Sequence, residues 1–267
     1  MIKKFGTING FILGVLSIFG AFLLEGGSVN ALFLIPPIII VFGGTFAAVI
    51  IGFGFENFKN MFRLIKLAYF PQKFEPKRII NHIVQFSYKA RKDGLLSLDR
   101  DINKVEFFFC KKLLRNAVDG TDPDSLLDMA ELEIKAVQER HYSNIFIFTK
   151  MGGYAPTMGI LGTVMGLIMA LSHAGADPNS LIKSIATAFI ATLWGVFSAN
   201  LIWLPIADKL KKCHQEEKQM MELSLQGVLA LQSGDIPAMV KARLISMLPQ
   251  KDQESMFPQR ELGKILR

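Results

Sequence analysis

The sequence predicts an all-α membrane protein with four transmembrane helices, a helical cytoplasmic insert between spans 2 and 3, and a helical C-terminal tail. Of its 267 residues, 51% are hydrophobic and 20% are charged, which indicates a membrane part and an aqueous part. Four apolar runs can each cross a hydrocarbon core of about 30 Å at about 1.5 Å per residue. The segments between them follow helical periodicity and lack the alternation of strands.

The first two runs predict an N-terminal transmembrane hairpin. They extend from Phe5 to Leu24 and from Ala31 to Phe55, and the link from Glu25 to Asn30 is short. Lys3 and Lys4 before the first run also fit a cleaved signal peptide. However, the run is longer than a usual signal core, and a second span follows almost at once. We therefore expect the hairpin to be retained.

The segment after this hairpin is predicted to be a helical domain rather than a linker. A helical stripe from Ile79 to Ala90 is followed by a glycine stop. Ser97 can cap a second helix that ends near Gly120. Pro123 suits the first turn of a third helix, which is expected to continue into the membrane.

The third and fourth runs predict a second hairpin, built on small residues. No Asp, Glu, Lys or Arg occurs between Met151 and Leu171 or between Ser184 and Ala207. Lipid tails are as apolar as leucine, so membrane helices associate through close packing, which small residues allow. The small residues recur every third or fourth position and form a seam on each helix: Ala155, Gly159, Gly162, Gly166 and Ala170 on one, and Ala188, Thr192, Gly195 and Ala199 on the other.

The fourth span is expected to extend past Pro205 as a helix to Gly234. A short helix from Pro237 to Leu248 follows, and the polar chain beyond Pro249 is expected to lack regular structure. The predicted divisions are an N-terminal transmembrane hairpin (1–55), a cytoplasmic helical domain (56–145), a pore-side transmembrane hairpin (146–207) and cytoplasmic C-terminal helices with a tail (208–267).

The distribution of basic residues predicts the orientation. Lys3 and Lys4 precede the first span, and residues 56–144 are rich in Lys and Arg. The link between spans 1 and 2 has no basic residue, the link between spans 3 and 4 has only Lys183, and Lys209 begins a basic cluster after span 4. Both termini are therefore expected in the cytoplasm of a multi-pass cytoplasmic-membrane protein. The net charge of +7 reflects this bias, so no nucleic-acid partner is expected.

Motifs for catalysis, cofactors and metals are not found in the sequence. The Gly52-Phe53-Gly54 run ends a membrane segment and is better explained by packing than by nucleotide binding. Cys213-His214 has no second pair at metal-site spacing, so no metal site is expected. Cys110 and Cys213 both fall in predicted cytoplasmic segments, where disulfides are rare, and should be free thiols. The protein is not expected to be an enzyme or to hold a cofactor.

Hydroxyl groups and prolines are the notable polar and conformational features of the last two spans. Ionisable groups within a membrane often mark an ion path, yet these spans have none near their centres. Thr163 and Thr192 can bond to neighbouring backbone, or they can line a narrow wet passage whose carboxylate belongs to another chain. Pro156 and Pro205 can be plain bends or pivots.

Three motifs, in the right order, resemble one known family. The run from Gly153 to Leu167 resembles the third span of the MotA/PomA flagellar stator proteins, and the run from Ala191 to Leu210 is similar to their fourth. The run from Ala90 to Asp99 is similar to their charged loop, although Asp99 replaces an expected Glu. The resemblance extends over nearly the whole chain, to about Leu248.

The resemblance implies an ion-driven motor component. Family members form a ring of five around two copies of MotB (or PomB), whose membrane Asp carries the ion, while cytoplasmic charges contact the rotor protein FliG. The coupling ion is expected to be a proton, with sodium as the alternative. By this resemblance the coupling prolines are Pro156 and Pro205, the ion path is lined by Thr163 and Thr192, and the rotor-contact charges are Arg91, Lys92 and Asp99.

Other classes of membrane protein share some of these features. ExbB/TolQ-like energy transducers have two similar core spans, but they usually have one N-terminal span and an external N-terminus. A solute carrier working alone would usually show repeated halves and a midplane site. A purely structural membrane scaffold stays possible on physical grounds. Arg91 near one helix end and Asp99 near the next helix start also fit helix-dipole compensation.

Overall fold

The computed structural model describes residues 6–72, 74–172 and 178–256, and these residues contain helices and no strand. Four helical segments are long and apolar enough to cross a membrane: Gly6–Leu24, Ile35–Phe53, Pro123–Ser172 and Pro178–Gln232. This confirms the predicted all-α membrane architecture. The chain divides into two units, a span unit (Met1–Gln72 with Arg140–Cys213) and a second unit (Lys73–Glu139 with His214–Arg267).

The first part of the span unit contains the N-terminal hairpin and a helix that the sequence reading missed. Its elements are α1 (Gly6–Leu24), α2 (Val29–Leu32), α3 (Ile35–Ile38), the π-helix η2 (Ile39–Gly43), α4 (Gly44–Phe53) and α5 (Phe55–Tyr69). The second span begins at Ile35 rather than at the predicted Ala31, because Pro36 occupies the first helical turn. Gly54 separates α4 from α5 with a φ of +81°, a value that glycine adopts readily.

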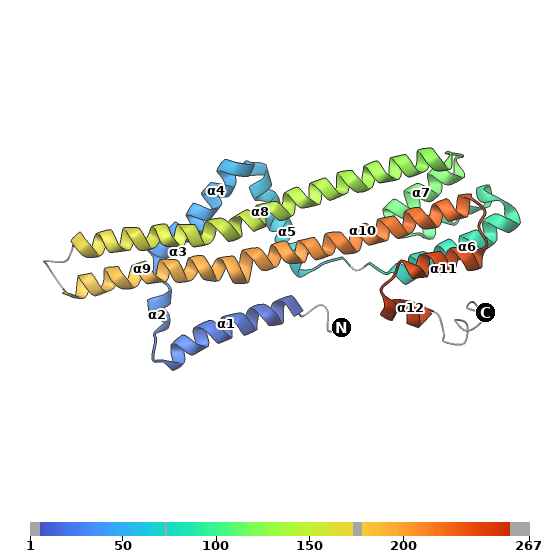
Figure 1. Cartoon of the computed structure of the whole chain (residues 1–267). Coiled ribbons are helices and arrows are strands. Elements are labelled where there is room, and N and C mark those ends of the chain that lie inside the picture. Colours follow the sequence, from blue (N-terminus) through green and yellow to red (C-terminus); the bar gives the residue numbers. More distant parts are fainter. Residues whose placement is uncertain (1–5, 73, 173–177, 257–267) are drawn as a thin grey trace. The chain divides into compact units, whose positions relative to one another are not determined.

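Two long helices carry the third and fourth spans. Helix α8 (Pro123–Ser172) is continuous over 50 residues, which confirms that the helix starting at Pro123 runs on into the third span. Helix α9 (Pro178–Ser198) continues through the π-helix η5 (Ala199–Trp203) into α10 (Leu204–Gln232). Figure 1 shows α8 and α9 lying side by side.

An aromatic cluster joins the first and second spans to the fourth span. The Trp194 ring on α9 lies 5.9 Å from the Phe19 ring of α1 and 6.1 Å from the Phe42 ring of η2, measured between centroids. Its indole N–H donates a hydrogen bond of 2.8 Å to the carbonyl oxygen of Leu32. A buried tryptophan needs such a partner for its polar group, so this bond ties the link between the first two spans to α9.

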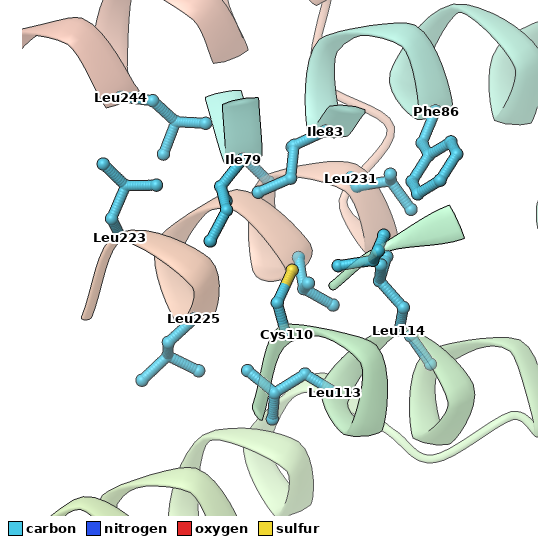
Figure 2. Close-up of a cluster of buried hydrophobic side chains, with 14 of the residues drawn as sticks. Ile79, Ile83, Phe86, Cys110, Leu113, Leu114, Leu223, Leu225, Leu231 and Leu244 are labelled. Atoms are coloured by element: carbon cyan, nitrogen blue, oxygen red, sulfur yellow. The ribbon is translucent and has the colours of Figure 1, made fainter. Parts of the chain in front are cut away.

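The second unit has its own hydrophobic core. It is built from α6 (Pro76–Asp93), the 3₁₀ turns η3 (Leu95–Leu98) and η4 (Ile102–Lys104), α7 (Phe108–Val118), parts of α8 and α10, α11 (Pro237–Ser246) and α12 (Gln250–Met256). Figure 2 shows Ile83 of α6, Cys110 of α7 and Leu223 of α10 pointing into this core. Each of these side chains is almost completely buried.

Two predictions about this unit are wrong. The helix expected from Ser97 does not form there. Instead, the Ser97 hydroxyl donates to the Gly94 carbonyl oxygen, and the chain passes through two 3₁₀ turns before α7 begins at Phe108. The segment after Pro249, expected to lack structure, forms α12 up to Met256. Lys77 of α6 contacts this helix through Asp252, with a separation of 3.6 Å between the charged atoms.

Candidate functional site

The third and fourth spans meet at backbone contact. A Cβ atom added to Gly159 of α8 would lie 2.9 Å from the carbonyl oxygen of Ala191 and 3.2 Å from the Cα of Gly195. A Cβ on Gly195 would lie 2.8 Å from the carbonyl oxygen of Ala155. Ordinary carbon–oxygen contacts are longer, so neither position has room for a side chain. Glycine is required here for close approach.

The remaining seam residues extend this contact within the same chain. A Cβ on Gly166 would lie 2.7 Å from the Ala188 Cβ, and one on Gly162 would lie 2.6 Å from the Ala191 Cβ. Ala199, at the start of η5, is 1% exposed. The small residues therefore bring α8 together with α9 of the same chain, so contacts with other chains must use other faces of these helices.

The two candidate ion-path hydroxyls lie beside each other across this seam. The Thr163 and Thr192 hydroxyl groups are hydrogen-bonded to one another. The Thr163 oxygen is also 3.1 Å from the Gly159 carbonyl oxygen and 3.0 Å from the Ala188 carbonyl oxygen. One hydroxyl carries a single hydrogen, so Thr163 donates to one carbonyl and accepts from Thr192. Both threonines are partly exposed, so the pair can also reach water or an ion outside the seam.

The turns of the two candidate coupling prolines are in contact. Pro156 lies inside α8, where a proline removes the hydrogen bond to the carbonyl of Gly152 one turn earlier. A Cβ on Gly152 would overlap the side chain of Leu204, which precedes Pro205 in α10. The turn that Pro156 weakens therefore packs against the turn that contains Pro205.

The fourth span reaches Pro205 through a π-helical turn. The Leu204 N–H donates to the Ala199 carbonyl oxygen, five residues back instead of the α-helical four. A proline ring clashes with the carbonyl of the residue four positions earlier in a regular α-helix. The wider turn directly before Pro205 relieves this constraint. The sequence allows a plain bend or a pivot at this proline, and the structure has a π-turn directly before it.

The candidate rotor charges all lie on the surface of the second unit. Arg91 and Lys92 occupy the last turn of α6, and Asp99 ends the 3₁₀ turn η3. All three residues are exposed and have no ion pair within the described part of the chain. The dipole explanation fits Arg91 and Lys92. It does not fit Asp99, which was expected in the first turn of an α-helix and is not in one.

A charge cluster that the sequence reading missed lies beside them. Asp101 accepts from Lys104 at 2.6 Å and from Lys89 at 2.7 Å. These bonds, first from Lys104 and then from Lys89, lower the pKa of Asp101 from 3.8 to about 2. Lys89 lies one helical turn from Lys92 and Asp101 lies two residues from Asp99, so the cluster links the loop that carries Asp99 to the helix that carries Arg91 and Lys92.

Both cysteines lie in the part of the chain that the structure describes. Cys110 is buried, and burial raises the pKa of its thiol to about 12. Cys213 likewise forms no disulfide. Within the ranges that the structure describes, no group of three His, Cys, Asp or Glu side chains could hold a metal ion. His173 and residues 175–177 lie outside the described residues.

Together these features define a class: a multi-pass helical membrane protein with a tight central hairpin and a charged second unit. Comparison with known families identifies the class further. Residues 8–94 match the motility protein A N-terminal family, and residues 101–223 match the MotA/TolQ/ExbB proton channel family. The N-terminal match favours the motility branch over the ExbB/TolQ alternative.

Individual relatives of the chain also belong to the motility branch. The chain is 35% identical to motility protein A of Bacillus subtilis, with 96% of this chain and 94% of that protein covered. It is 32% identical to the chemotaxis protein PomA of Vibrio alginolyticus, with 91% and 93% covered. It superposes on a chain of the flagellar MotAB stator complex of Bacillus subtilis with a TM-score of 0.87 and 34% identity, over 93% of this chain and 98% of that one. The chain belongs to the MotA/PomA family of flagellar motor stator proteins, a family of ion channels and torque generators and not of enzymes.

Proposed function

We propose that this chain assembles with a MotB-like partner into a stator that converts ion flow into torque on the rotor. The observation that carries the proposal is the hydroxyl pair of Thr163 and Thr192 within spans that contain no carboxylate of their own. Hydroxyls can hold water or an ion in place, but they do not release and rebind a proton near neutral pH as a carboxylate does. The ion-carrying group must therefore come from a second chain, and the similar Bacillus subtilis structure is that of a MotAB complex.

Measurements of ion flux test whether the partner chain supplies the ion-carrying group. Vesicles that contain this chain alone should conduct neither protons nor sodium appreciably, and flux should appear when the partner is co-expressed. A partner whose membrane Asp is replaced by Asn is the matched control, because it preserves assembly but removes the titratable group. Strong flux through this chain alone would refute the proposal.

The proposed coupling ion is the proton. The Gly159 and Ala188 carbonyl oxygens, which could ligate sodium, both lie within hydrogen-bond distance of the Thr163 hydroxyl. Thr163 donates its one hydrogen to one of these oxygens, and a hydroxyl paired in this way supports a hydrogen-bonded water path better than a ready-made cation cage. Motor torque at fixed membrane potential should then be independent of external sodium and should fall when the proton gradient is removed. A torque that tracks sodium would identify sodium as the ion.

We place both termini and the second unit on the cytoplasmic side, and we propose a ring of five copies around two partner chains. The basic residues of 56–144 and the cluster from Lys209 support this orientation. Gly166→Leu should separate α8 from α9 within each copy and thereby prevent assembly, because Gly166 is packed on Ala188 of its own chain. Unchanged assembly and motility of this variant would contradict the packing.

The rotor contact is assigned to Arg91, Lys92 and Asp99, and FliG is the proposed partner. Their exposure and lack of ion pairs in the described chain leave these charges available for an opposing surface. Arg91→Glu should impair torque while the protein still assembles, and a charge reversal on the rotor should partly restore it.

Arg115→Glu is the matched control for the dipole explanation. Arg115 is an exposed arginine in the last turn of α7, so both substitutions lose the same favourable interaction with a helix C-terminus, about 0.3–1 kcal/mol. Only Arg91→Glu should reduce torque. If both variants lower the amount of folded protein equally, and no rotor substitution restores motility, Arg91 stabilises a helix end and the contact is refuted.

A further inference from the structure

A cavity of about 490 Å³ lies in the span unit, between the first turns of α1 and the region where the fourth span becomes α10. Gly10 and Phe11 line it from α1, Tyr69 lines it from α5, and Leu201 and Pro205 line it from the fourth span. Further along, α1 packs closely on the fourth span, where a Cβ on Gly14 would overlap the Leu201 side chain. Near its N-terminal end α1 leaves this surface, and the cavity opens between the two helices.

One rim of the cavity is basic. Asp208, Lys209 and Lys212 line it, which gives a net charge of +1. Lys209 is half-buried, and neither lysine has an ion pair in the described part of the chain. Lys211 is exposed and does not line the cavity. Two lysine ammonium groups therefore face one opening without a matching pair of carboxylates.

The position of the basic rim along the fourth span indicates what kind of molecule fits this cavity. The fourth span has no charge from Ser184 to Ala207, and Asp208 is its first charged residue, so the basic rim lies at the end of the apolar run. The apolar walls of the cavity are Phe11 of α1 and Leu201 of the fourth span. A soluble anion could bind the lysines but would leave these apolar walls uncovered. A phospholipid offers both a phosphate for the rim and an acyl chain for the walls.

We propose that this cavity binds an anionic phospholipid, with its headgroup phosphate at Lys209 and Lys212 and an acyl chain against Gly10 and Phe11. The proposal relies on the proposed topology in one respect, since that topology places the cavity in the cytoplasmic leaflet. Pro205 lines the same cavity, so the bound lipid touches the turn that is assigned to coupling. The anionic lipid content of the membrane then acts on the stator at this turn.

The test is native mass spectrometry of the full chain co-expressed with its partner, titrated with phosphatidylglycerol or with phosphatidylcholine of the same acyl chains. Phosphatidylglycerol should bind more tightly. Lys209→Gln combined with Lys212→Gln should weaken that binding about 30-fold, because each basic residue near an anionic headgroup contributes about a fivefold effect. Lys211→Gln is the matched control and should leave binding unchanged. Equal binding of both lipids, or an equal effect of Lys211→Gln, would overturn the proposal.

A second pair of variants tests the apolar wall without touching the lysines. Gly10 and Gly20 both lie on α1 with no atom within 4 Å of an added Cβ, but only Gly10 lines the cavity. Gly10→Leu should fill the cavity and remove most of the retained phosphatidylglycerol, whereas Gly20→Leu should not. Unchanged retention in Gly10→Leu would overturn the site, as would displacement of the lipid by inorganic phosphate alone. Lipid binding is measured without motility or ion flux, so a failure of the proposed motor function would be seen separately.

Discussion

Replacing Gly159 by alanine adds one methyl group at the closest approach of α8 and α9. The new Cβ would lie 2.9 Å from the Ala191 carbonyl oxygen. That atom belongs to the backbone, so relief requires movement of a whole helix rather than of one side chain. A separation of about 0.5 Å already forfeits about a quarter of the dispersion energy of each atom pair along the seam. Membrane helices rely on this packing, because lipid offers no hydrophobic driving force between them.

The loss of stability in Gly159→Ala can be judged by comparison with Gly153→Ala on the same helix. A Cβ on Gly153 would have no atom within 4 Å, so this variant gains helix propensity without a clash. Gly159→Ala gains the same propensity but also introduces overpacking, which costs about 1–3 kcal/mol. The difference between the two variants isolates the clash. We expect Gly159→Ala to be less stable than Gly153→Ala by about 1–3 kcal/mol.

The two tryptophans of the chain provide the assay. Trp194 and Trp203 both lie in the fourth span, so their fluorescence reports its unfolding as SDS is titrated into mixed micelles. The midpoint for Gly159→Ala should move to lower SDS, and that for Gly153→Ala should stay or rise. Equal midpoints for the two variants would refute the claim that α8 and α9 meet at backbone contact.

Three further predictions concern individual side chains. Cys110 should resist alkylation in the folded protein and react only on unfolding, because it is buried and its pKa is raised to about 12; reaction at pH 7 in the folded state would contradict this. Because the pKa of Asp101 falls from 3.8 to about 2 on folding, its stabilising effect should be complete above pH 3.8 and lost towards pH 2, so Asp101→Asn should flatten acid unfolding in that window. In a cysteine-free background, new cysteines at Ser28 and Asn179 should react with an impermeant thiol reagent in intact cells, and labelling at Ser97 would overturn the proposed orientation.

The spans could be predicted because the membrane imposes a simple rule on composition. Charge-free runs of sufficient length identify all four, and the small-residue spacing indicates the close-packing faces. The residues at which the helices begin and end were predicted less well from the sequence. Pro36 delays the second helix to Ile35, a local effect that the hydropathy of the Ala31–Phe55 run does not report. Helix α5 was missed although Met61, Leu64 and Ala68 show the spacing of one buried face.

The second unit shows why periodicity alone was insufficient. Leu98, Ile102 and Val105 are spaced like one helix face, and all three are buried. The spacing therefore predicted burial correctly but not the path of the chain, which uses 3₁₀ turns there. The Lys89–Asp101 pair could not be predicted for a related reason, because it depends on how η3 and η4 fold back toward α6.

The π-turn before Pro205 also determines the register of everything that follows it. One extra residue within Ala199–Trp203 rotates the rest of the helix by about 100° compared with an uninterrupted α-helix. The residues of α10 that are buried within the span unit, among them Ile206 and Leu210, occur in the sequence at positions that already include this rotation. Deleting one residue from the π-turn would put Pro205 back against a regular helical turn and would turn these residues away from their neighbours. Single-residue insertions and deletions should therefore be tolerated far less here than in an exposed loop, even where the composition of the span is unchanged.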